Sequence, residues 1–404
     1  MIKNTLLDEL FIVDAGRTAI GGKHKSLKEV SAAQLAGCVM EGLLRRTNLL
    51  NDKHAASKGP VDRVILGNTV SAGTGQNLAR QAVFLSGLPM TVPAFTVNSV
   101  CASGLQAVIS GIQSIVTEES GVILAGGTES ASQCPSFSRK GTKDEKEGDA
   151  QDLIDSLIYD GLECQMSGKH MGELAEYIAE EFKITRQMQD QYALGSHVKA
   201  CRAQEENKFE GEIITVKTSD NKFFSKDEKP RKNASLEKLM NLPPAFKEGG
   251  TVTAGNASMP ADGAAVFLLA SADAVREYHL TPRARILGYA SVAVDPQLTF
   301  TAAVPATTEC LRHSGLTLKE IDLFEICESF SAQAILTQRK LDIPEEKMNI
   351  FGGDVALGHP LGASGARALT TLFYALKSQN KKRGLVSVCF GSGGAVSVAI
   401  ERIG

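Results

Sequence analysis

Two cysteines and one histidine stand at places in the chain where side chains of these types could do chemistry. Cys101 lies where an apolar segment runs into the first turn of an expected helix. Unpaired amide groups and the helix dipole at such a position favour the thiolate form of a cysteine. A thiolate is the form that attacks the carbonyl carbon of a thioester. On position alone, a buried structural role for Cys101 is at least as good an interpretation as a reactive one.

His359 lies in the segment G-H-P-L-G-A-S-G, directly ahead of a second expected helix. A histidine there could take the proton of Cys101 if both residues face one cavity. Cys389 ends an apolar segment and precedes F-G-S-G-G, whose glycines allow the backbone to approach a ligand and present amide donors. A second thiol could act as an acid or a base. A loop histidine held by backbone groups and a buried strand cysteine are the alternatives.

The elements that would position these residues alternate between strands and helices. Apolar runs at 10–13, 64–67 and 122–127 predict buried strands. Residues 30–44 predict a helix with small residues on its packing side, and 95–101 predict a strand that runs directly into a helix. Strands alternating with helices argue for an α/β fold.

The C-terminal part of the chain repeats this order of elements. Three segments match in the same order: 321–325 with 61–65, 362–369 with 101–108, and 385–391 with 122–127. In both halves an A-S-G triplet opens a helix, and small residues there let two helices approach closely. Two related α/β units would place Cys101 and His359 at equivalent positions. Chance similarity of glycine-rich segments is the alternative.

Composition narrows the class of protein. A chain of 404 residues exceeds the size of one hydrophobic core, so two or more domains are expected. A net charge of −3 gives no global basic field for nucleic acid or an anionic membrane. The eight cysteines form no C-x-x-C pair, so a zinc site has little support and free thiols are expected. The ends of the chain carry no recognisable targeting signal, which favours the cytoplasm.

A middle section of different character separates the two halves. Residues 171–181 and 185–204 predict amphipathic helices, and 222–240 is basic with a proline break. This section is typical of an inserted lid rather than of a third repeat.

Taken together, these segments resemble the thiolases, especially the acetyl-CoA acetyltransferase branch. The likeness runs from about Leu10 to the C-terminus. It rests on V-N-S-V-C-A-S-G-L-Q-A-V, A-G-G-T-E-S, H-M-G-E-L-A-E, G-T-V-T-A-G-N-A-S, G-G-D-V-A-L-G-H-P-L-G-A-S-G-A-R and C-F-G-S-G-G. The number and order of these motifs make the resemblance specific.

The resemblance implies a thiolase-like fold with two duplicated α/β halves in a layered α/β/α/β/α arrangement. Helices lie between two mixed sheets, and a loop domain is inserted in the first half. The expected boundaries are 1–132 plus 261–282 for the N-terminal half, 133–260 for the loop domain and 283–404 for the C-terminal half. Homo-oligomers, either dimers or tetramers, are expected.

The resemblance also implies an activity and the residues that carry it. Cys101 becomes acylated, His359 activates it and helps to bind the thioester oxygen, and Cys389 moves the α-proton of the second acyl group. Backbone amides of Cys101 and Gly391 form an oxyanion hole. Two acyl-CoA molecules condense to a 3-oxoacyl-CoA, and thiolysis is the reverse. Coenzyme A and acetyl-CoA are substrates, with no tightly bound cofactor and no metal.

The lid supplies the coenzyme site in this family. By the resemblance, Arg231 lies near the adenine and Ser258 near the pantetheine arm. The expected tunnel and coenzyme contacts are completed by Leu162, His170, Met171 and Phe330. The basic run at 229–232 would suit the phosphates of the coenzyme, although such a run is usually only solvated.

The chain departs from the family pattern beside its reactive residues. Cys327 stands where an asparagine usually holds a water of the first oxyanion hole; it is kept here as a catalytic candidate. A lost donor costs about 3 kcal/mol in the transition state unless a neighbour such as Ser329 replaces it. Asp354 replaces a small residue five positions before His359, and Thr299 replaces a methionine of the acyl pocket.

Three hypotheses follow. The first is an active thiolase using acetyl-CoA or a close relative. The second is a catalytically weakened acyl-CoA-binding protein or complex subunit, motivated by Cys327. The third, a decarboxylating ketoacyl synthase, is disfavoured because Cys389 stands where those enzymes have a second histidine.

Overall fold

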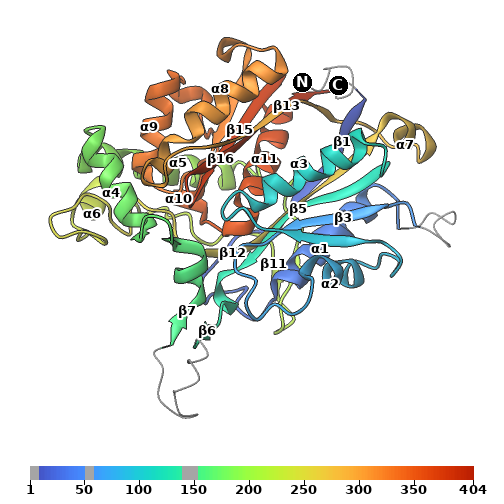
Figure 1. Cartoon of the computed structure of the whole chain (residues 1–404), viewed down its shortest axis with the longest axis horizontal. Coiled ribbons are helices and arrows are strands. Elements are labelled where there is room, and N and C mark those ends of the chain that lie inside the picture. Colours follow the sequence, from blue (N-terminus) through green and yellow to red (C-terminus); the bar gives the residue numbers. More distant parts are fainter. Residues whose placement is uncertain (1–8, 51–58, 139–152) are drawn as a thin grey trace.

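A computed structural model describes residues 9–50, 59–138 and 153–404. Residues 1–8 and 51–58 of the expected N-terminal half and 139–152 of the expected insertion lie outside this description. Two similar α/β halves lie edge to edge, and their strands follow one hydrogen-bonded order, β14-β15-β16-β13-β1-β12-β5-β3-β4 (Figure 1).

Each half contributes strands and helices in corresponding order. The N-terminal half holds β1 (Leu10–Arg17), β2 (Gly21–Gly22), α1 (Ala32–Arg46), β3 (Arg63–Gly67), α2 (Leu78–Leu85), β4 (Ala94–Val97), α3 (Ser103–Val116), β5 (Val122–Ser130) and β12 (Ala261–Ser271). The C-terminal half holds β13 (Ala284–Ala293), α8 (Ala303–Ser314), β14 (Leu323–Ile326), α9 (Ser331–Leu341), α10 (Asp354–Leu357), α11 (Leu361–Ser378), β15 (Arg383–Phe390) and β16 (Gly394–Arg402), with α7 (Ala272–Glu277) between the halves.

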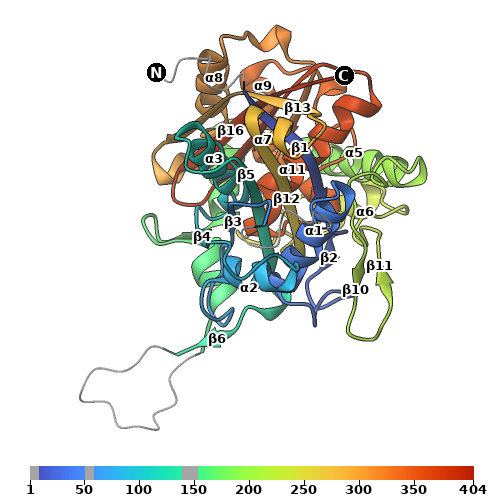
Figure 2. The ribbon, with the colours of Figure 1, turned by 90° about the vertical axis from the view of Figure 1, so that its right-hand side faces the viewer.

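The section between β5 and β12 is built from short elements and longer helices. These are β6 (Ser136–Phe137), β7 (Ile154–Asp155), a π-helix (Leu157–Leu162), β8 (Glu163–Cys164), β9 (Lys169–His170), α4 (Met171–Glu181), α5 (Arg186–Glu205), β10 (Val216–Lys217), β11 (Phe223–Phe224) and α6 (Leu236–Met240). Helices α4, α5 and α6 lie against the C-terminal half, while the β10–β11 hairpin projects beside α1 (Figures 1 and 2).

The internal duplication predicted from the sequence is confirmed by the pairing of the strands. In the order β1-β12-β5-β3 the first two pairs are antiparallel and the last is parallel, and β13-β16-β15-β14 repeats this pattern. The expected two sheets are joined, because β1 and β13 pair at Phe11 with Arg285 and at Ile12 with Ala284. The halves therefore share one continuous sheet at their junction.

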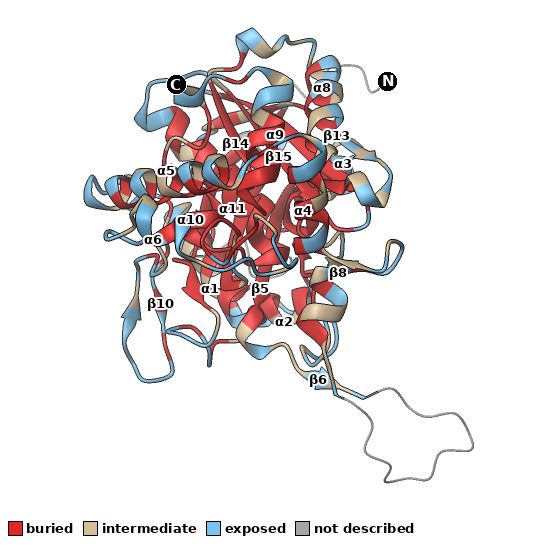
Figure 3. Ribbon diagram, turned by 90° about the vertical axis from the view of Figure 1, so that its left-hand side faces the viewer, coloured by how far each residue is buried: buried red, intermediate tan, exposed pale blue. Residues whose placement is uncertain are grey.

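Helices α3 and α11 form the central layer of the molecule. Both contact each other and strands from the sheet of each half, whereas α1 packs on the outer face of β12 and β5 and α8 packs on β13 and β16. Figure 3 shows α11 in the buried centre, and its residues from Leu361 to Phe373 are all buried. The layers thus follow the α/β/α/β/α arrangement.

Small residues allow this central layer to form. A Cβ atom added to Gly127 of β5 would lie 2.0 Å from the carbonyl oxygen of Gly362, and one on Gly104 of α3 would lie 2.8 Å from the same oxygen. The backbones of β5, α3 and α11 therefore meet directly. The prediction that the A-S-G triplets let two helices approach closely is confirmed.

Replacing Gly127 by alanine is expected to destabilise the fold by about 3 kcal/mol, because backbone atoms surround the added methyl group and none can move away freely. Gly195 is the matched control: it lies inside α5 with no atom within 4 Å of an added Cβ. Alanine there is expected to stabilise the protein by about 1 kcal/mol through helix propensity. Urea unfolding of both variants measures the difference. Equal stability of the two would contradict the close packing.

A buried ion cluster fixes the inserted section to β1. The guanidinium of Arg17, which is fully buried, donates to both oxygens of Asp227 at 2.7 and 2.9 Å and to Glu212 at 2.7 Å. Removing one partner of such a cluster leaves an uncompensated buried charge. The basic residues that follow Asp227 are therefore held at a fixed distance from the core.

Within the described residues, no helix combines the length and the apolar content that crossing a membrane requires.

Candidate active site

Cys101 lies in a tight turn between β4 and α3. The strand predicted to continue to Cys101 ends at Val97, because side chains of the next residues bind the backbone: Asn98 Oδ1 accepts from the amide of Val100 at 2.9 Å. Val100 has φ 49°, which is rare for a β-branched residue and marks local strain. The strained turn places Cys101 directly ahead of the first turn of α3, where the helix dipole favours an anion.

Glu129 ties this turn to the segment that carries His359. Its buried carboxylate accepts from the amide of Thr69 at 3.0 Å and from the amide of Gly362 at 2.9 Å. Thr69 in turn donates its hydroxyl to the carbonyl oxygen of Val100 at 2.9 Å. One side chain therefore fixes the start of α11 relative to the turn before Cys101.

The ring of His359 is held through one of its nitrogens. Nδ1 lies 2.7 Å from Ser364 Oγ, and the Ser364 hydroxyl donates its proton to the carbonyl oxygen of Pro360 at 3.0 Å. Since that hydroxyl has one proton, its oxygen accepts from Nδ1–H. Nε2 has no hydrogen-bond partner among the described residues, so this nitrogen can exchange a proton with a reacting group.

The charge state of His359 follows from its neighbours. Burial disfavours the cation, but the charge of Cys101 and then Asp354 outweigh it and raise the pKa of His359 to about 10. A histidine in this state forms an ion pair with a cysteine thiolate. Cys101 and His359 are therefore suited to be nucleophile and proton carrier.

Cys389 stands at the end of β15 in a different electrostatic environment. Burial, and then the charge of Cys101, raise the pKa of Cys389 to about 12, while a hydrogen bond from Ser329 opposes the shift. A thiol with so high a pKa holds its proton at rest, and its thiolate is a strong base. The turn that follows is fixed by Thr299, which donates to the carbonyl oxygen of Phe390 at 2.7 Å and does not line the pocket.

These residues line one small pocket. Eight of the residues predicted for the site are among its walls: Cys101, His359, Cys389, Gly391, Leu162, Met171, Ser258 and Phe330. The remaining walls are Gly161, Pro260, Phe300, Ser329 and Phe390. The pocket is thus formed by both halves and by the inserted section.

Cys327 is not among the walls of this pocket. Its side chain is fully buried, and its thiol donates to the carbonyl oxygen of Ser364 at 3.7 Å. Burial, and then the charge of Asp354, raise the pKa of Cys327 well above its ordinary value. The structure therefore places Cys327 behind His359 as a neutral thiol, whereas the hydroxyl-bearing Ser329 lies in the wall itself.

Arg231 lines a second pocket. This pocket also contains His197, Lys229, Lys238 and Met259. Burial, and then Arg231 and Lys229, lower the pKa of His197 to about 4, so its ring is neutral among cations. Met259 lies between Ser258 and Pro260, which line the inner pocket, so the two pockets share the 258–260 segment.

His170 forms part of the support around the inner pocket rather than its wall. It caps α4 by accepting from the amide of Gly172 at 3.0 Å, and its ring stacks on Phe246 at 5.0 Å between centroids. Phe246 contacts Phe330 edge-on at 6.1 Å. His170 is therefore connected to the pocket wall through the rings of Phe246 and Phe330.

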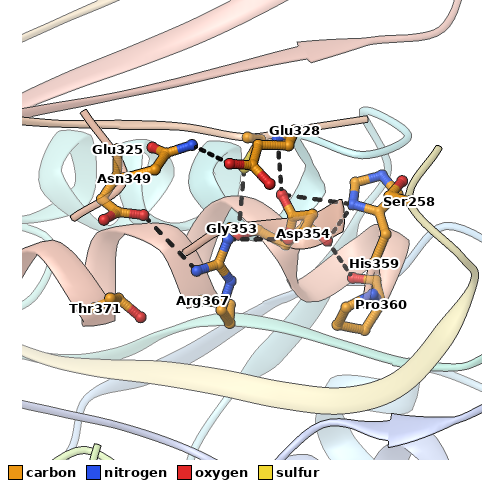
Figure 4. Close-up of polar contacts among 12 residues, drawn as sticks. Ser258, Glu325, Glu328, Asn349, Gly353, Asp354, His359, Pro360, Arg367 and Thr371 are labelled. Carbon is orange, nitrogen blue, oxygen red and sulfur yellow. Dashed lines mark hydrogen bonds and ion pairs between the residues drawn. The ribbon is translucent and has the colours of Figure 1, made fainter. Parts of the chain in front are cut away.

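The structure adds a buried polar network that the sequence did not reveal. Figure 4 shows Asp354 between His359 and Arg367, with Glu325 on the far side of the guanidinium. Glu328 accepts from Asn349 and from hydroxyl groups of α5, which connects the network to the inserted section. Asp354 stood out in the sequence as a departure from the family pattern, but nothing there indicated its partners.

Comparison with known proteins agrees with this fold. The family model described as "Thiolase, N-terminal domain" matches residues 10–273, and "Thiolase, C-terminal domain" matches 280–402. A "Probable acetyl-CoA acyltransferase" of Staphylococcus aureus (strain COL) is 42% identical, with 98% of this chain and 100% of that protein covered. An "Acetyl-CoA acetyltransferase" of Allochromatium vinosum is 41% identical over the same shares of both chains.

Solved structures give the same result. The acetyl-CoA acetyltransferase of Bacillus anthracis aligns with a TM-score of 0.91 and 37% identity, covering 98% of this chain and 99% of that one. Human mitochondrial 3-ketoacyl-CoA thiolase in complex with CoA aligns with a TM-score of 0.91 and 38% identity, covering 98% of each chain.

A duplicated α/β fold with a thiol–imidazole pair and a second thiol in one pocket defines an acyl-transferring enzyme. The chain belongs to the thiolase family. Its substrates are coenzyme A thioesters, and the comparisons favour the active enzyme over the weakened acyl-CoA-binding protein.

Proposed function

We propose that this thiolase condenses two molecules of acetyl-CoA to acetoacetyl-CoA, and cleaves the product in reverse, through an acyl group carried on Cys101. The observation that carries the proposal is the shared pocket of Cys101, His359 and Cys389. The rings of Phe300 and Phe330 pack in its wall with 5.3 Å between their centroids, and these two bulky side chains favour a short acyl chain.

In the first half-reaction, the Cys101 thiolate attacks the carbonyl carbon of acetyl-CoA. The carbon–sulfur bond to the coenzyme breaks, and the coenzyme thiolate takes the proton from His359. Backbone amides of Cys101 and Gly391 are the donors proposed for the developing oxyanion. Gly391 lies beside Val100, the residue before the nucleophile, which supports this pairing.

In the second half-reaction, the neutral His359 takes the proton of the Cys389 thiol, which restores the His359 cation. The Cys389 thiolate then removes a proton from the α-carbon of a second acetyl-CoA. The enolate oxygen is stabilised by the His359 cation, and the α-carbon attacks the acetyl group on Cys101. A carbon–carbon bond forms, and the Cys101–acyl bond breaks to return the thiolate. The high pKa of Cys389 suits this step, since its thiolate is a strong base.

The coenzyme is proposed to lie across both pockets. Lys229, Arg231 and Lys238 in the outer pocket suit its phosphates and adenine, and Ser258 suits the pantetheine arm that leads inward. The CoA complex of the human relative supports such a site.

Residues 133–260, with α4, α5 and α6, are proposed as the inserted domain. The two halves are then formed by 1–132 plus 261–282 and by 283–404.

A homo-oligomer is proposed because β4 ends the sheet and carries apolar groups to its surface. Phe84, Met90 and Phe95 around this edge are 66%, 60% and 41% exposed. An unpaired strand edge beside apolar side chains is a site where another chain adds.

The eight free cysteines suit a reducing compartment, which supports a cytoplasmic location.

The test is a thiolysis assay of 3-oxoacyl-CoA substrates of increasing length with free CoA, together with intact-protein mass measurement after incubation with acetyl-CoA. Acetoacetyl-CoA is expected to be cleaved best, and one acetyl group is expected on Cys101. Absence of both cleavage and adduct would refute the proposal. Cleavage that prefers long chains would retain the chemistry and refute the short acyl pocket.

A further inference from the structure

A buried carboxylate lies behind His359, on the side of the ring away from the free nitrogen. Asp354 Oδ2 is 3.9 Å from His359 Nδ1, and the Asp354 side chain is fully buried (Figure 4). Nδ1 donates to Ser364, so the carboxylate faces the protonated nitrogen of the ring. A negative charge at this distance favours the cationic form of the imidazole.

The charge of this carboxylate is held by two donors. Arg367 Nη2 lies 2.9 Å from Asp354 Oδ1, and the amide of Glu328 donates to Oδ2 at 3.1 Å. Burial opposes ionisation, but Arg367 and then His359 lower the pKa of Asp354 to about 2. Asp354 is therefore ionised at neutral pH.

Glu325 is a second carboxylate near Arg367, but it is in a different state. Its Oε2 lies 3.8 Å from Arg367 Nη1, and burial raises its pKa well above the ordinary value. The neutral form of Glu325 is thus favoured, and Asp354 provides the negative charge that pairs with Arg367. Only one of the two carboxylates can act on His359 as a charge.

The side chain of Cys327 adds little to His359 on this side of the pocket. Cys327 is turned to the carbonyl oxygen of Ser364, and a thiol is a weak donor. Charge that develops on a substrate oxygen beside His359 therefore depends on the ring itself for part of its stabilisation. A cationic ring does this better than a neutral one.

We propose that Asp354, held by Arg367, is a positioning residue that orients the His359 ring and keeps it cationic beside Cys101. The inference rests on the proposed role of His359 in the acyl transfer. Asp354 acts only through the ring, because it does not line the pocket. The charged or titratable groups that face this cluster are Cys101, Cys327, Cys389, Glu212, Glu325, Glu328 and Arg367.

The test replaces Asp354 by asparagine, which keeps the shape and removes the charge, and follows kcat and kcat/KM of acetoacetyl-CoA thiolysis against pH. Loss of a nearby negative charge lowers the pKa of His359. The alkaline limb of kcat/KM is therefore expected to move to lower pH by about one unit or more. We expect kcat to fall about tenfold at pH 8, with KM for CoA changed by less than about twofold.

Glu325→Gln is the matched control, because it alters the same buried network without facing His359. It is expected to leave the pH profile of wild type unchanged. An unmoved alkaline limb in Asp354→Asn, or an equal shift in both variants, would overturn the inference. A wild-type enzyme without any thiolysis would instead refute the proposed function.

A measurement on the wild-type protein keeps the inference testable if Asp354→Asn does not fold. The His359 ring can be titrated by NMR with isotope-labelled histidine, its signal assigned with His359→Gln. The cation is expected to persist above about pH 8, whereas titration at or below about 6.5, the ordinary value, would overturn the inference.

Discussion

Replacing Cys101 by alanine is expected to reduce kcat for thiolysis of acetoacetyl-CoA by about 10⁴-fold or more, as for other enzymes that lose their nucleophile. Cys389 lies in the same pocket but cannot take its place, because burial, the largest cause of the raised pKa of Cys389, remains in the variant and keeps this thiol protonated. The acetyl adduct on the protein is expected to disappear with the activity. Rate assays and intact-protein mass measurement check both results.

The loss must reflect chemistry rather than unfolding. Cys101 is 7% exposed and small, so truncation to alanine is expected to cost about 1 kcal/mol of stability. Cys310→Ala is the matched control: Cys310 is fully buried in α8, donates to the carbonyl oxygen of Gly288 at 3.5 Å and lies in a separate apolar cluster. This control is expected to lose similar stability and keep its activity. More than about a tenth of wild-type activity in Cys101→Ala would be incompatible with a covalent mechanism.

The duplicated fold could be predicted because its signal is carried by local patterns. Short apolar runs and A-S-G triplets recur in the same order in both halves, and each is visible within a few residues of sequence. In the structure, Gly104 of the first triplet meets the backbone of Gly362, the residue directly before the second triplet, at the centre of the molecule. The equivalent positions of Cys101 and His359 ahead of α3 and α11 follow from the same repeat.

The support behind His359 could not be predicted, because its parts come from distant segments. Arg367 lies among small residues of α11 and is only 1% exposed, whereas a lone arginine in a helix is usually solvated. Its partners Asp354 and Glu325 stand in α10 and β14. Arg367 meets these two carboxylates only in the folded protein, and no periodic pattern in the sequence indicates that they lie close together.

The position of Cys327 shows a related limit. Its place in the family pattern made it a catalytic candidate, but a pattern gives the residue type and not the direction of the side chain. The thiol donates to the carbonyl oxygen of Ser364, and Cys327 is not among the pocket walls. The turn at Val100 was missed for a similar reason, since a positive φ at a valine leaves no mark in the composition around it.

Replacing Cys389 by alanine is expected to separate the two half-reactions. Cys101 and His359 remain, so the variant is expected to become acetylated and to exchange labelled CoA into acetyl-CoA within about tenfold of the wild-type rate. Condensation to acetoacetyl-CoA requires removal of the α-proton, and losing a positioned base costs about 10²–10⁴-fold. The exchange assay and the condensation assay are run on the same preparation, with Cys310→Ala again as the control.

The exchange and condensation assays together distinguish the proposed role of Cys389 from two alternatives. Cys389 is only 1% exposed, and burial raises its pKa to about 12, so the thiolate forms only when it takes part in a proton transfer. A variant that loses exchange as well as condensation would show that Cys389 acts in the acylation of Cys101. A variant that keeps both would show that the base is elsewhere, and within the pocket His359 would be the remaining titratable group able to serve.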